Sequence, residues 1–287
     1  MPAAAILVVV LLALAGCGGD ETGSTRLEGV PDGPPAPDSA IPREPAALAA
    51  RLTETQRALD RAVDAWRREG DPSSGPPPEE VTLYALDQQR IHQRLTGRLR
   101  FAKRVLAHVP GRVAAHARAT IRARRELAAL ATPQPRDRFS TGRPAPAGIL
   151  LRDYREAQRR FRVAWPVLAA VNFVESAFGR MRNRSTAGAQ GPMQFIPSTW
   201  AAYGMGGDIH DPDDAVLGAA NYLHANGAPR DYRRALYAYN RSGLYVDAVL
   251  AYADRIRRDP RNFFAYYAWQ VFVRTPSGTR RITGPGI

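Results

Sequence analysis

Two proline-rich stretches divide the chain, and a regular helix cannot run through either of them. Residues 18–45 include the run Val30-Pro31-Asp32-Gly33-Pro34-Pro35-Ala36-Pro37, and residues 132–148 carry four more prolines. Because proline lacks a backbone N–H and pushes the preceding residue towards extended backbone, these stretches interrupt helices. The first stretch predicts a semi-extended tether. The second predicts a boundary between a helical region (46–131) and a compact domain (149–260), which a tail (261–287) follows.

An apolar run at the start of the chain ends at its only cysteine. Residues 3–15 carry no polar side chain, and their length suits the core of a signal peptide better than a membrane span. The sequence Leu14-Ala15-Gly16-Cys17 resembles the bacterial lipobox, which implies cleavage before Cys17 and lipidation of its thiol. The alternative is a buried helix with an incidental cysteine. We therefore expect residues 1–17 to be a lipoprotein signal peptide, and the protein to be exported and lipid-anchored at the outer face of the cell membrane.

Basic residues outnumber acidic ones, 40 to 27 over 287 residues, and the excess is concentrated in the helical region. Residues 79–131 hold 11 basic and 4 acidic side chains. Such an excess favours an anionic neighbour, which could be nucleic acid, a membrane surface or an anionic wall polymer. Export makes nucleic acid a poor partner. A single cysteine also excludes an internal disulfide framework and a four-cysteine zinc site.

The helical region shows three amphipathic patterns. The first carries apolar side chains at helical spacing, at Leu48, Leu52, Leu59, Val63 and Trp66. The second begins at Glu79 and continues towards Val109, and the third spans about Arg112 to Ala131. Because Pro110-Gly111 separates the last two, they predict an antiparallel helical hairpin with the first helix packed against it.

Two interpretations fit the arginines on these helices. They could form a surface that binds wall polymer or lipid headgroups, or the solvated face of a helical bundle, which we favour because charge runs on helices are usually solvated. The residues concerned are Arg90, Arg94, Arg98, Arg100, Arg104, Arg118, Arg122, Arg124 and Arg125. His92, His108 and His116 lack metal-ligand spacing and are interpreted as surface or packing residues.

A single glutamate stands out in the compact domain. Trp165-Pro166 suits the first turn of a helix, which carries Glu175 near its end. Phe173, Val174 and Phe178 surround this carboxyl in the sequence, so desolvation is expected to raise its pKa. A carboxyl group that stays protonated near neutral pH can act as a general acid towards a glycosidic oxygen.

Three motifs follow one another at specific spacing: Glu175-Ser176, then Gly188-Ala189-Gln190-Gly191-Pro192-Met193-Gln194, then Tyr239-Asn240. This order resembles the lytic transglycosylase family with a goose-type lysozyme-like (SLT) catalytic domain, over roughly residues 150–260. The resemblance implies a mostly α-helical, lysozyme-like fold. It also implies that Glu175 is the catalytic acid.

The resemblance suggests substrate-binding roles for five further residues. Ser185 would position the acetamido group of the substrate, and Met193 and Gln194 would line the sugar site. Tyr239 and Asn240 would organise the acid and the N-acetyl group. Purely structural roles remain open for several motif and neighbouring residues: Gly188, Gly191, Met193, Trp200 and Tyr203.

The function implied is that of a peptidoglycan lytic transglycosylase. Such an enzyme cleaves the β-1,4 bond between N-acetylmuramic acid (MurNAc) and N-acetylglucosamine (GlcNAc) and leaves 1,6-anhydro-MurNAc ends. The expected partner is the glycan strand of peptidoglycan, and no metal or organic cofactor is expected. One alternative is a hydrolytic muramidase of the same fold. Another is a non-catalytic wall-binding lipoprotein that acts as a scaffold for other cell-wall enzymes.

The acidic run Asp208-Ile209-His210-Asp211-Pro212-Asp213-Asp214 could indicate a metal site or the start of a helix. An aspartate before a proline, with two acids in the next turn, favours the helix start.

The tail (261–287) has a β-rich pattern. Residues 268–274 alternate in part, Pro276-Ser277-Gly278 suits a turn, and residues 279–283 could form a partner strand. The sequence thus predicts a small C-terminal β-hairpin. With the proline-rich stretch 132–148 as a boundary, residues 148–287 are expected to fold independently.

Overall fold

A computed structural model of the protein describes residues 33–287. The predicted signal peptide, Cys17 and the first part of the tether lie outside the described residues. The described part is mostly helical and carries a two-stranded antiparallel sheet near its C-terminus, which confirms the predicted fold class. None of its helices combines the length and the apolar character that a membrane crossing requires.

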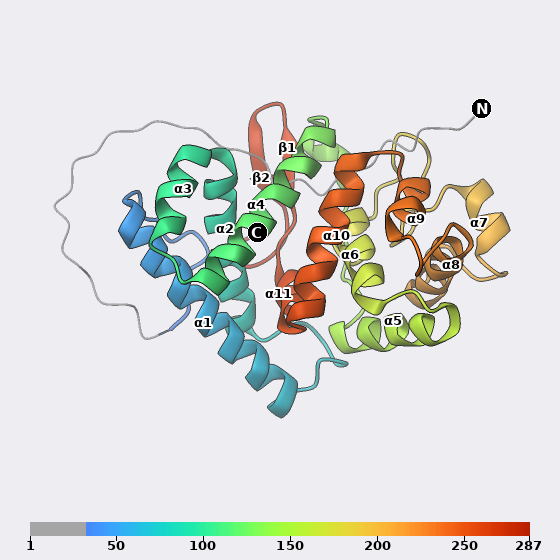
Figure 1. Ribbon diagram of the computed structural model, residues 1–287, viewed down its shortest axis with the longest axis horizontal. Helices are drawn as coiled ribbons and strands as arrows, with labels where there is room; N and C mark the ends of the chain where they lie inside the picture. Colours follow the sequence, from blue (N-terminus) through green and yellow to red (C-terminus); the bar gives the residue numbers. More distant parts are fainter. Residues whose placement is uncertain (1–32) are drawn as a thin grey trace.

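The elements follow one another in two groups, before and after the proline-rich stretch 132–148 (Figure 1). The first group comprises α1 (Pro45–Glu69), α2 (Glu79–Gly97), α3 (Leu99–Ala107) and α4 (Gly111–Leu130). A short 3-10 helix, η1 (Arg136–Arg138), lies in the stretch itself. The second group comprises α5 (Ala147–Phe161), α6 (Trp165–Ser176), α7 (Pro197–Tyr203), α8 (Pro212–Ala225), α9 (Tyr232–Tyr239), α10 (Gly243–Arg258), α11 (Arg261–Ala268), β1 (Phe272–Thr275) and β2 (Gly278–Arg281).

The predicted second helix is divided in two. It ends at Gly97 because Arg98 adopts φ −138° and ψ 71°, outside the helical region, and α3 begins directly afterwards. Glycine at this point lowers helix propensity, so the break falls where the backbone is least committed. Strands β1 and β2 pair with Phe272 opposite Arg281 and Thr275 opposite Gly278, which confirms the predicted hairpin.

Helix α6 lies at the centre of the second group. Every residue from Pro166 to Ser176 is buried, which explains why this helix lacks a polar face. Helix α10 packs against α6 on one side and along α4 on the other, so it joins the second group of helices to the first (Figure 1).

A single hydrophobic cluster extends across the proline-rich stretch 132–148. It joins Leu59 and Trp66 of α1 and Leu127 of α4 to Phe173 of α6 and Trp269 of the tail. The stretch therefore separates two segments of sequence without separating two cores. The expected independence of residues 148–287 needs a test against this packing.

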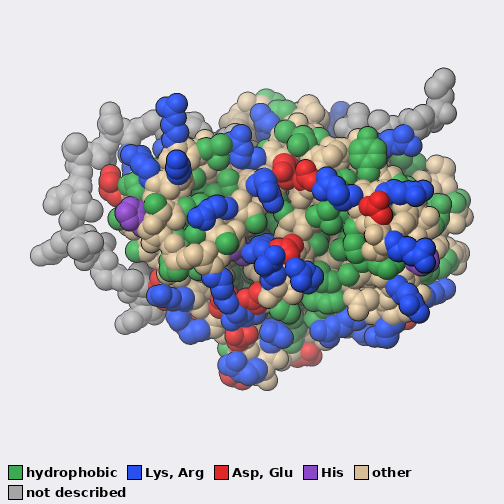
Figure 2. Space-filling view, viewed as in Figure 1, with side chains coloured by type: hydrophobic (Ala, Val, Ile, Leu, Met, Phe, Trp, Pro, Cys, Tyr) green, Lys and Arg blue, Asp and Glu red, His purple; other side chains and the backbone are tan. Residues whose placement is uncertain are grey.

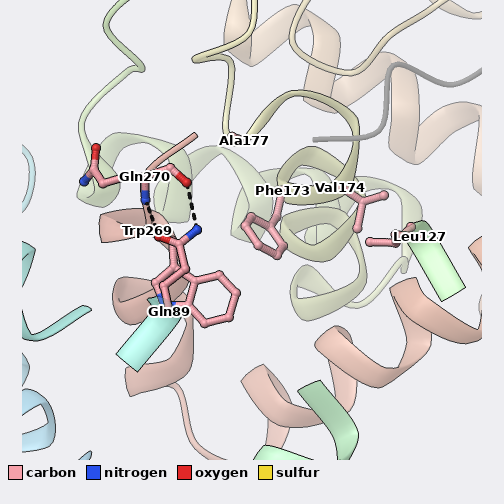
Figure 3. Close-up of a pocket in the computed structure, with 7 residues that line it drawn as sticks. All are labelled: Gln89, Leu127, Phe173, Val174, Ala177, Trp269 and Gln270. Atoms are coloured by element: carbon pink, nitrogen blue, oxygen red, sulfur yellow. Dashed lines mark hydrogen bonds between the residues drawn. The ribbon is translucent and has the colours of Figure 1, made fainter. Parts of the chain in front are cut away.

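Buried hydrogen bonds fasten the tail to α2. The Trp269 indole N–H donates to Gln88 Oε1 at 3.0 Å. Gln89 and Gln270 exchange two bonds, in which Gln89 Nε2 donates to the Gln270 carbonyl at 2.8 Å and the Gln270 N–H donates to Gln89 Oε1 at 2.9 Å (Figure 3). These residues lie beside a cavity of about 10 Å³, also lined by Phe173, where α2, α4, α6 and the tail meet. A space of that size holds about one water molecule.

The structure corrects the prediction of a solvated basic face at Arg124. Its side chain is 0% exposed, its guanidinium lies 5.8 Å from the Trp269 ring, and none of its nitrogens has a hydrogen-bond partner among the described residues. Burial lowers the pKa of Arg124 to about 9. The reason is that α4 packs against α2 and α10, and Arg124 itself lies over Trp269 of the tail. His92 and His116 are packing residues here, with ring centroids 5.8 Å apart, whereas His108 is exposed.

Candidate active site

Glu175 lies in the last turn of α6, directly before an unusual backbone segment. Ala177 and Phe178 both have positive φ, 52° and 62°, and Gly179 follows with φ 82°. Positive φ is rare for residues with a Cβ, so the backbone is strained immediately after the candidate acid. Phe178 N–H still donates to the Asn172 carbonyl at 3.2 Å, which closes the end of the helix.

The Glu175 side chain is 3% exposed and has one hydrogen-bond partner among the described residues. The Tyr245 hydroxyl, from the first turn of α10, donates to Oε1 at 2.7 Å. Burial raises the pKa of Glu175 to about 8, although the Tyr245 hydrogen bond opposes the shift. Because Oε1 accepts the tyrosine proton, the proton of the neutral carboxyl belongs on Oε2. The group is therefore a protonated acid at neutral pH.

The loop that contains the second motif is fixed to the helices around Glu175. Asn172, one turn before Ser176 on α6, donates from Nδ2 to the Pro192 carbonyl at 2.8 Å. The Tyr239 hydroxyl at the end of α9 donates to the Met193 carbonyl at 2.7 Å. Burial raises the pKa of Tyr239 well above its usual value, and the nearby Glu175 adds to that effect. The Tyr239 hydroxyl thus holds the loop in place.

Glycine is required within this loop at Gly191. Its φ is 76°, and a Cβ there would lie 1.9 Å from the Ile209 carbonyl oxygen. Any side chain would therefore push two backbone segments apart. Ser185 stabilises the start of the same loop, where its hydroxyl accepts from the Ala189 N–H at 3.0 Å.

Several polar atoms near the loop are not used by the fold. Gln194 donates from Nε2 to the Gly191 carbonyl at 3.0 Å, but its Oε1 is buried without a partner among the described residues, as is Gln190 Oε1. The Asn240 side chain is also buried. Amide groups of this kind can donate to and accept from the amide of a ligand.

Met193, which was expected to line the sugar site, and the neighbouring Trp200 and Tyr203 make packing contacts within the domain. Met193 is 0% exposed and belongs to the main hydrophobic cluster, so it supports the loop and does not line a sugar site. The Trp200 indole donates to the Gly207 carbonyl at 3.2 Å and packs on Phe195. Tyr203 packs edge-on against Tyr222.

The acidic run is the start of a helix, as predicted. Asp211 is the N-cap of α8 and accepts from the Asp213 and Asp214 N–H groups, with Pro212 in the first turn. Asp214 accepts from the Asp208 N–H at 2.8 Å, and Asp231 caps α9. Within residues 33–287, the influences on the Glu175 pKa are burial and Tyr245, without a contribution from a second carboxylate.

Tyr245 and Gln190 are two residues near the candidate site that were not predicted from the sequence. Tyr245 belongs to no recognised motif, and its contact with Glu175 joins residues 70 positions apart. The available signal was its place five residues after Asn240, in the first turn of a helix that Ser242 caps. Gln190 lies inside the second motif, but the family resemblance suggests no role for it.

The family described as Transglycosylase SLT domain matches residues 153–258. The match covers little more than a third of the 287 residues and includes all three motifs. Residues 153–258 therefore form a transglycosylase SLT domain with a lysozyme-like fold, a class of domain with a transglycosylase-type function on peptidoglycan glycan strands. No curated protein and no solved structure matches the chain.

Proposed function

We propose that the protein is a peptidoglycan lytic transglycosylase and that Glu175 is its single acid and base. The observation that carries this proposal is the buried Glu175 carboxyl, with a pKa of about 8 and a hydrogen bond from Tyr245. The proton on Oε2 is available to a glycosidic oxygen, and the Tyr245 hydrogen bond fixes the orientation of the carboxyl group.

The proposed reaction uses no external nucleophile. Glu175 transfers its proton to the oxygen that links MurNAc C1 to GlcNAc, and the C1–O bond breaks. The MurNAc 6-hydroxyl oxygen then attacks C1, and its proton returns to the Glu175 carboxylate. The product is a 1,6-anhydro-MurNAc end, and the acid is restored without consuming water. Proximity favours this internal hydroxyl when no second carboxylate activates water.

The unused amide groups support an N-acetylated substrate. An acetamido group presents one N–H donor and one carbonyl acceptor. Gln194 Oε1 and Gln190 Oε1 are acceptors without partners in the described structure. The buried Asn240 amide carries both a donor and an acceptor. Leaving buried acceptors unpaired is unfavourable by about 1–3 kcal/mol each, so a ligand that donates to them gains affinity.

The test of the acid is release of soluble fragments from purified peptidoglycan. Glu175→Gln should lower the rate by about 10²–10⁴-fold, because an amide cannot donate the required proton. Glu156→Gln, at an exposed glutamate of α5, is the matched control and should leave the rate unchanged. Undiminished release by a folded Glu175→Gln variant would remove Glu175 from the mechanism. A folded wild type that binds glycan and releases nothing would favour the scaffold alternative.

We further propose that the protein is exported and anchored to the outer face of the cell membrane through a lipid on Cys17. The support is the lipobox resemblance at the only cysteine of the chain. Cys17→Ala should move the protein from the detergent phase to the aqueous phase after phase separation. A wild-type protein found wholly in the aqueous phase with residues 1–16 attached would contradict the proposal.

A further inference from the structure

A surface groove lies between α3 and α4, at residues far from Glu175 in the sequence. Ten side chains line a groove of about 740 Å³ there. Its floor is apolar and is formed by Leu99, Ala102, Leu106 and Ala107 of α3 and Ile121 of α4. Leu99 is 48% exposed and contributes a large apolar side chain to the groove. Exposed apolar surface in a concave site commonly marks the binding site of a ligand.

Cationic side chains form the rim of this groove. Lys103 lies on α3, and Arg118, Arg122 and Arg125 lie on α4, whereas Glu126 is the one acid among the lining residues. Figure 2 shows Lys and Arg side chains around hydrophobic ones over the part of the molecule where these helices lie. Arg122 reaches Glu126 at only 4.0 Å, and the other three cations form no ion pair with any residue between 33 and 287.

The arginines at the end of α10, unlike the cations of the groove, are paired with a carboxylate. Arg255, Arg257 and Arg258 share the Asp254 carboxylate at 2.5–2.8 Å, and they lower the pKa of Asp254 to about 2, against its burial. The cations around the α3–α4 groove are not neutralised in this way. Their field therefore acts on whatever enters the groove.

The apolar floor and the cationic rim together favour a ligand that is an anionic amphiphile. A wall polymer that is polar along its length gains nothing from the floor, and a flat bilayer meets the rim without filling a concave groove. The groove volume lies in the range of small-ligand sites, about 300–1,000 Å³. A standard protein interface needs about 20–30 residues from each partner, well above the ten that line this groove.

We propose that the α3–α4 groove binds one molecule of an anionic phospholipid. The acyl chains lie on the apolar floor, and the phosphate is held by the arginines of α4, whose guanidinium groups match phosphate geometry. This interaction does not depend on the chemistry at Glu175 or on a lipid at Cys17. It gives the helices before the SLT domain a ligand of their own.

Isothermal titration calorimetry of the full-length chain carrying Cys17→Ser, with dihexanoylphosphatidylglycerol below its micelle concentration, tests the proposal. The substitution prevents attachment of an acyl group to the chain. We expect saturable binding of one lipid per chain, and affinity lower by about tenfold or more for dihexanoylphosphatidylcholine, which corresponds to about 1.4 kcal/mol. Residues 3–15 are present in every variant, so their contribution cancels.

Two variants should weaken this binding, and two control variants should not. Ala107→Trp fills the groove at an exposed position, and Arg118→Glu combined with Arg125→Glu reverses its charge; each should weaken binding by about tenfold or more. Ala50→Trp on α1 and Arg159→Glu on α5, both exposed, should have no effect. Equal affinity in the groove variants, equal affinity for the choline lipid, or binding only to phosphatidylglycerol vesicles would overturn the proposal. Binding of an acidic amphipathic peptide but not of the lipid would make the groove a protein-docking site and would equally overturn it.

Discussion

The SLT domain and the helices before it both bury polar side chains, but the two regions differ in whether those side chains find hydrogen-bond partners. Around Glu175, the hydroxyls of Tyr245 and Tyr239 and the amide of Asn172 each have a defined partner. Between α4 and the tail, the Arg124 guanidinium and both His92 ring nitrogens are buried without one among the described residues. Unpaired buried donors are unfavourable, so the junction between α4 and the tail is less stable than full pairing would make it. The three paired groups instead hold the backbone and the carboxyl of the candidate site in place.

The segment that matches the SLT family is also smaller than the hydrophobic core to which it belongs. The family match ends at residue 258, but the core that supports α6 includes Trp269 beyond it and Leu127 before it. The helices before the SLT domain thus complete its core.

The largest expected effect is that of removing those helices. A chain of residues 148–287 exposes the apolar faces that α1, α2 and α4 cover, and each fully buried large side chain contributes about 1.5–3 kcal/mol. Several such losses exceed the net stability of a typical domain, about 5–15 kcal/mol. We expect a non-cooperative thermal melt by circular dichroism. A cooperative melt with retained glycan cleavage would show that the proline-rich stretch is a true domain boundary.

The second-largest expected effect is a loss of folding stability at low pH, at the junction between α4 and the tail. Burial, helped by Arg255 and Arg112 and opposed by Asp259, lowers the pKa of His116 to about 4 from 6.5, and His92 shifts in the same direction. The folded state binds fewer protons, so this contribution is complete above pH 6.5 and is lost as the pH falls towards 4. The loss at His116 is about 3 kcal/mol. Chemical denaturation at several pH values should show this slope, and His116→Leu should flatten it. An unchanged slope in His116→Leu would assign it to other groups.

Replacing the unpaired guanidinium should raise stability. Arg124→Met keeps the length of the side chain and removes a buried charge without a partner, so we expect a gain of about 1–3 kcal/mol. Arg122→Met, two residues earlier on α4 but exposed, should change stability by less than about 0.5 kcal/mol. A loss of stability in Arg124→Met would mean that its contact with Trp269 outweighs the burial of its charge.

The smallest expected effect concerns Tyr245. Tyr245→Phe removes the hydrogen bond that holds down the pKa of Glu175, so the pKa should rise above about 8. Activity depends on the protonated acid and falls as the pH passes that pKa, so its alkaline limb should move to higher pH. The lost hydrogen bond should lower stability by about 1 kcal/mol. Tyr252→Phe, on the same helix with a hydroxyl that has no partner within the described structure, should leave the pH–rate profile unchanged.

Local patterns predicted much of this structure. The N-cap at Asp211, the start of α6 at Trp165 and the C-terminal hairpin each depend on residues close together in the sequence. Motif order identified Glu175, and its apolar neighbours predicted the raised pKa that the structure shows.

Contacts between distant segments were not predicted. Arg124 belongs to a charged helix face, and only the packing of α4 against α10 and the tail makes it buried. Tyr245 meets Glu175 because α10 packs on α6. The continuous core was missed because prolines in 132–148 indicate a break in local structure, whereas the later segments fold back onto α2.

The central claim is that Glu175 acts alone and that water is not the nucleophile. Digestion of purified peptidoglycan in oxygen-18-labelled water, followed by mass spectrometry of the released fragments, tests this most directly. The account predicts anhydro products that are one water lighter than hydrolysis products and carry no label. Reducing-end products that carry one labelled oxygen for each bond cleaved would contradict it and would identify a muramidase.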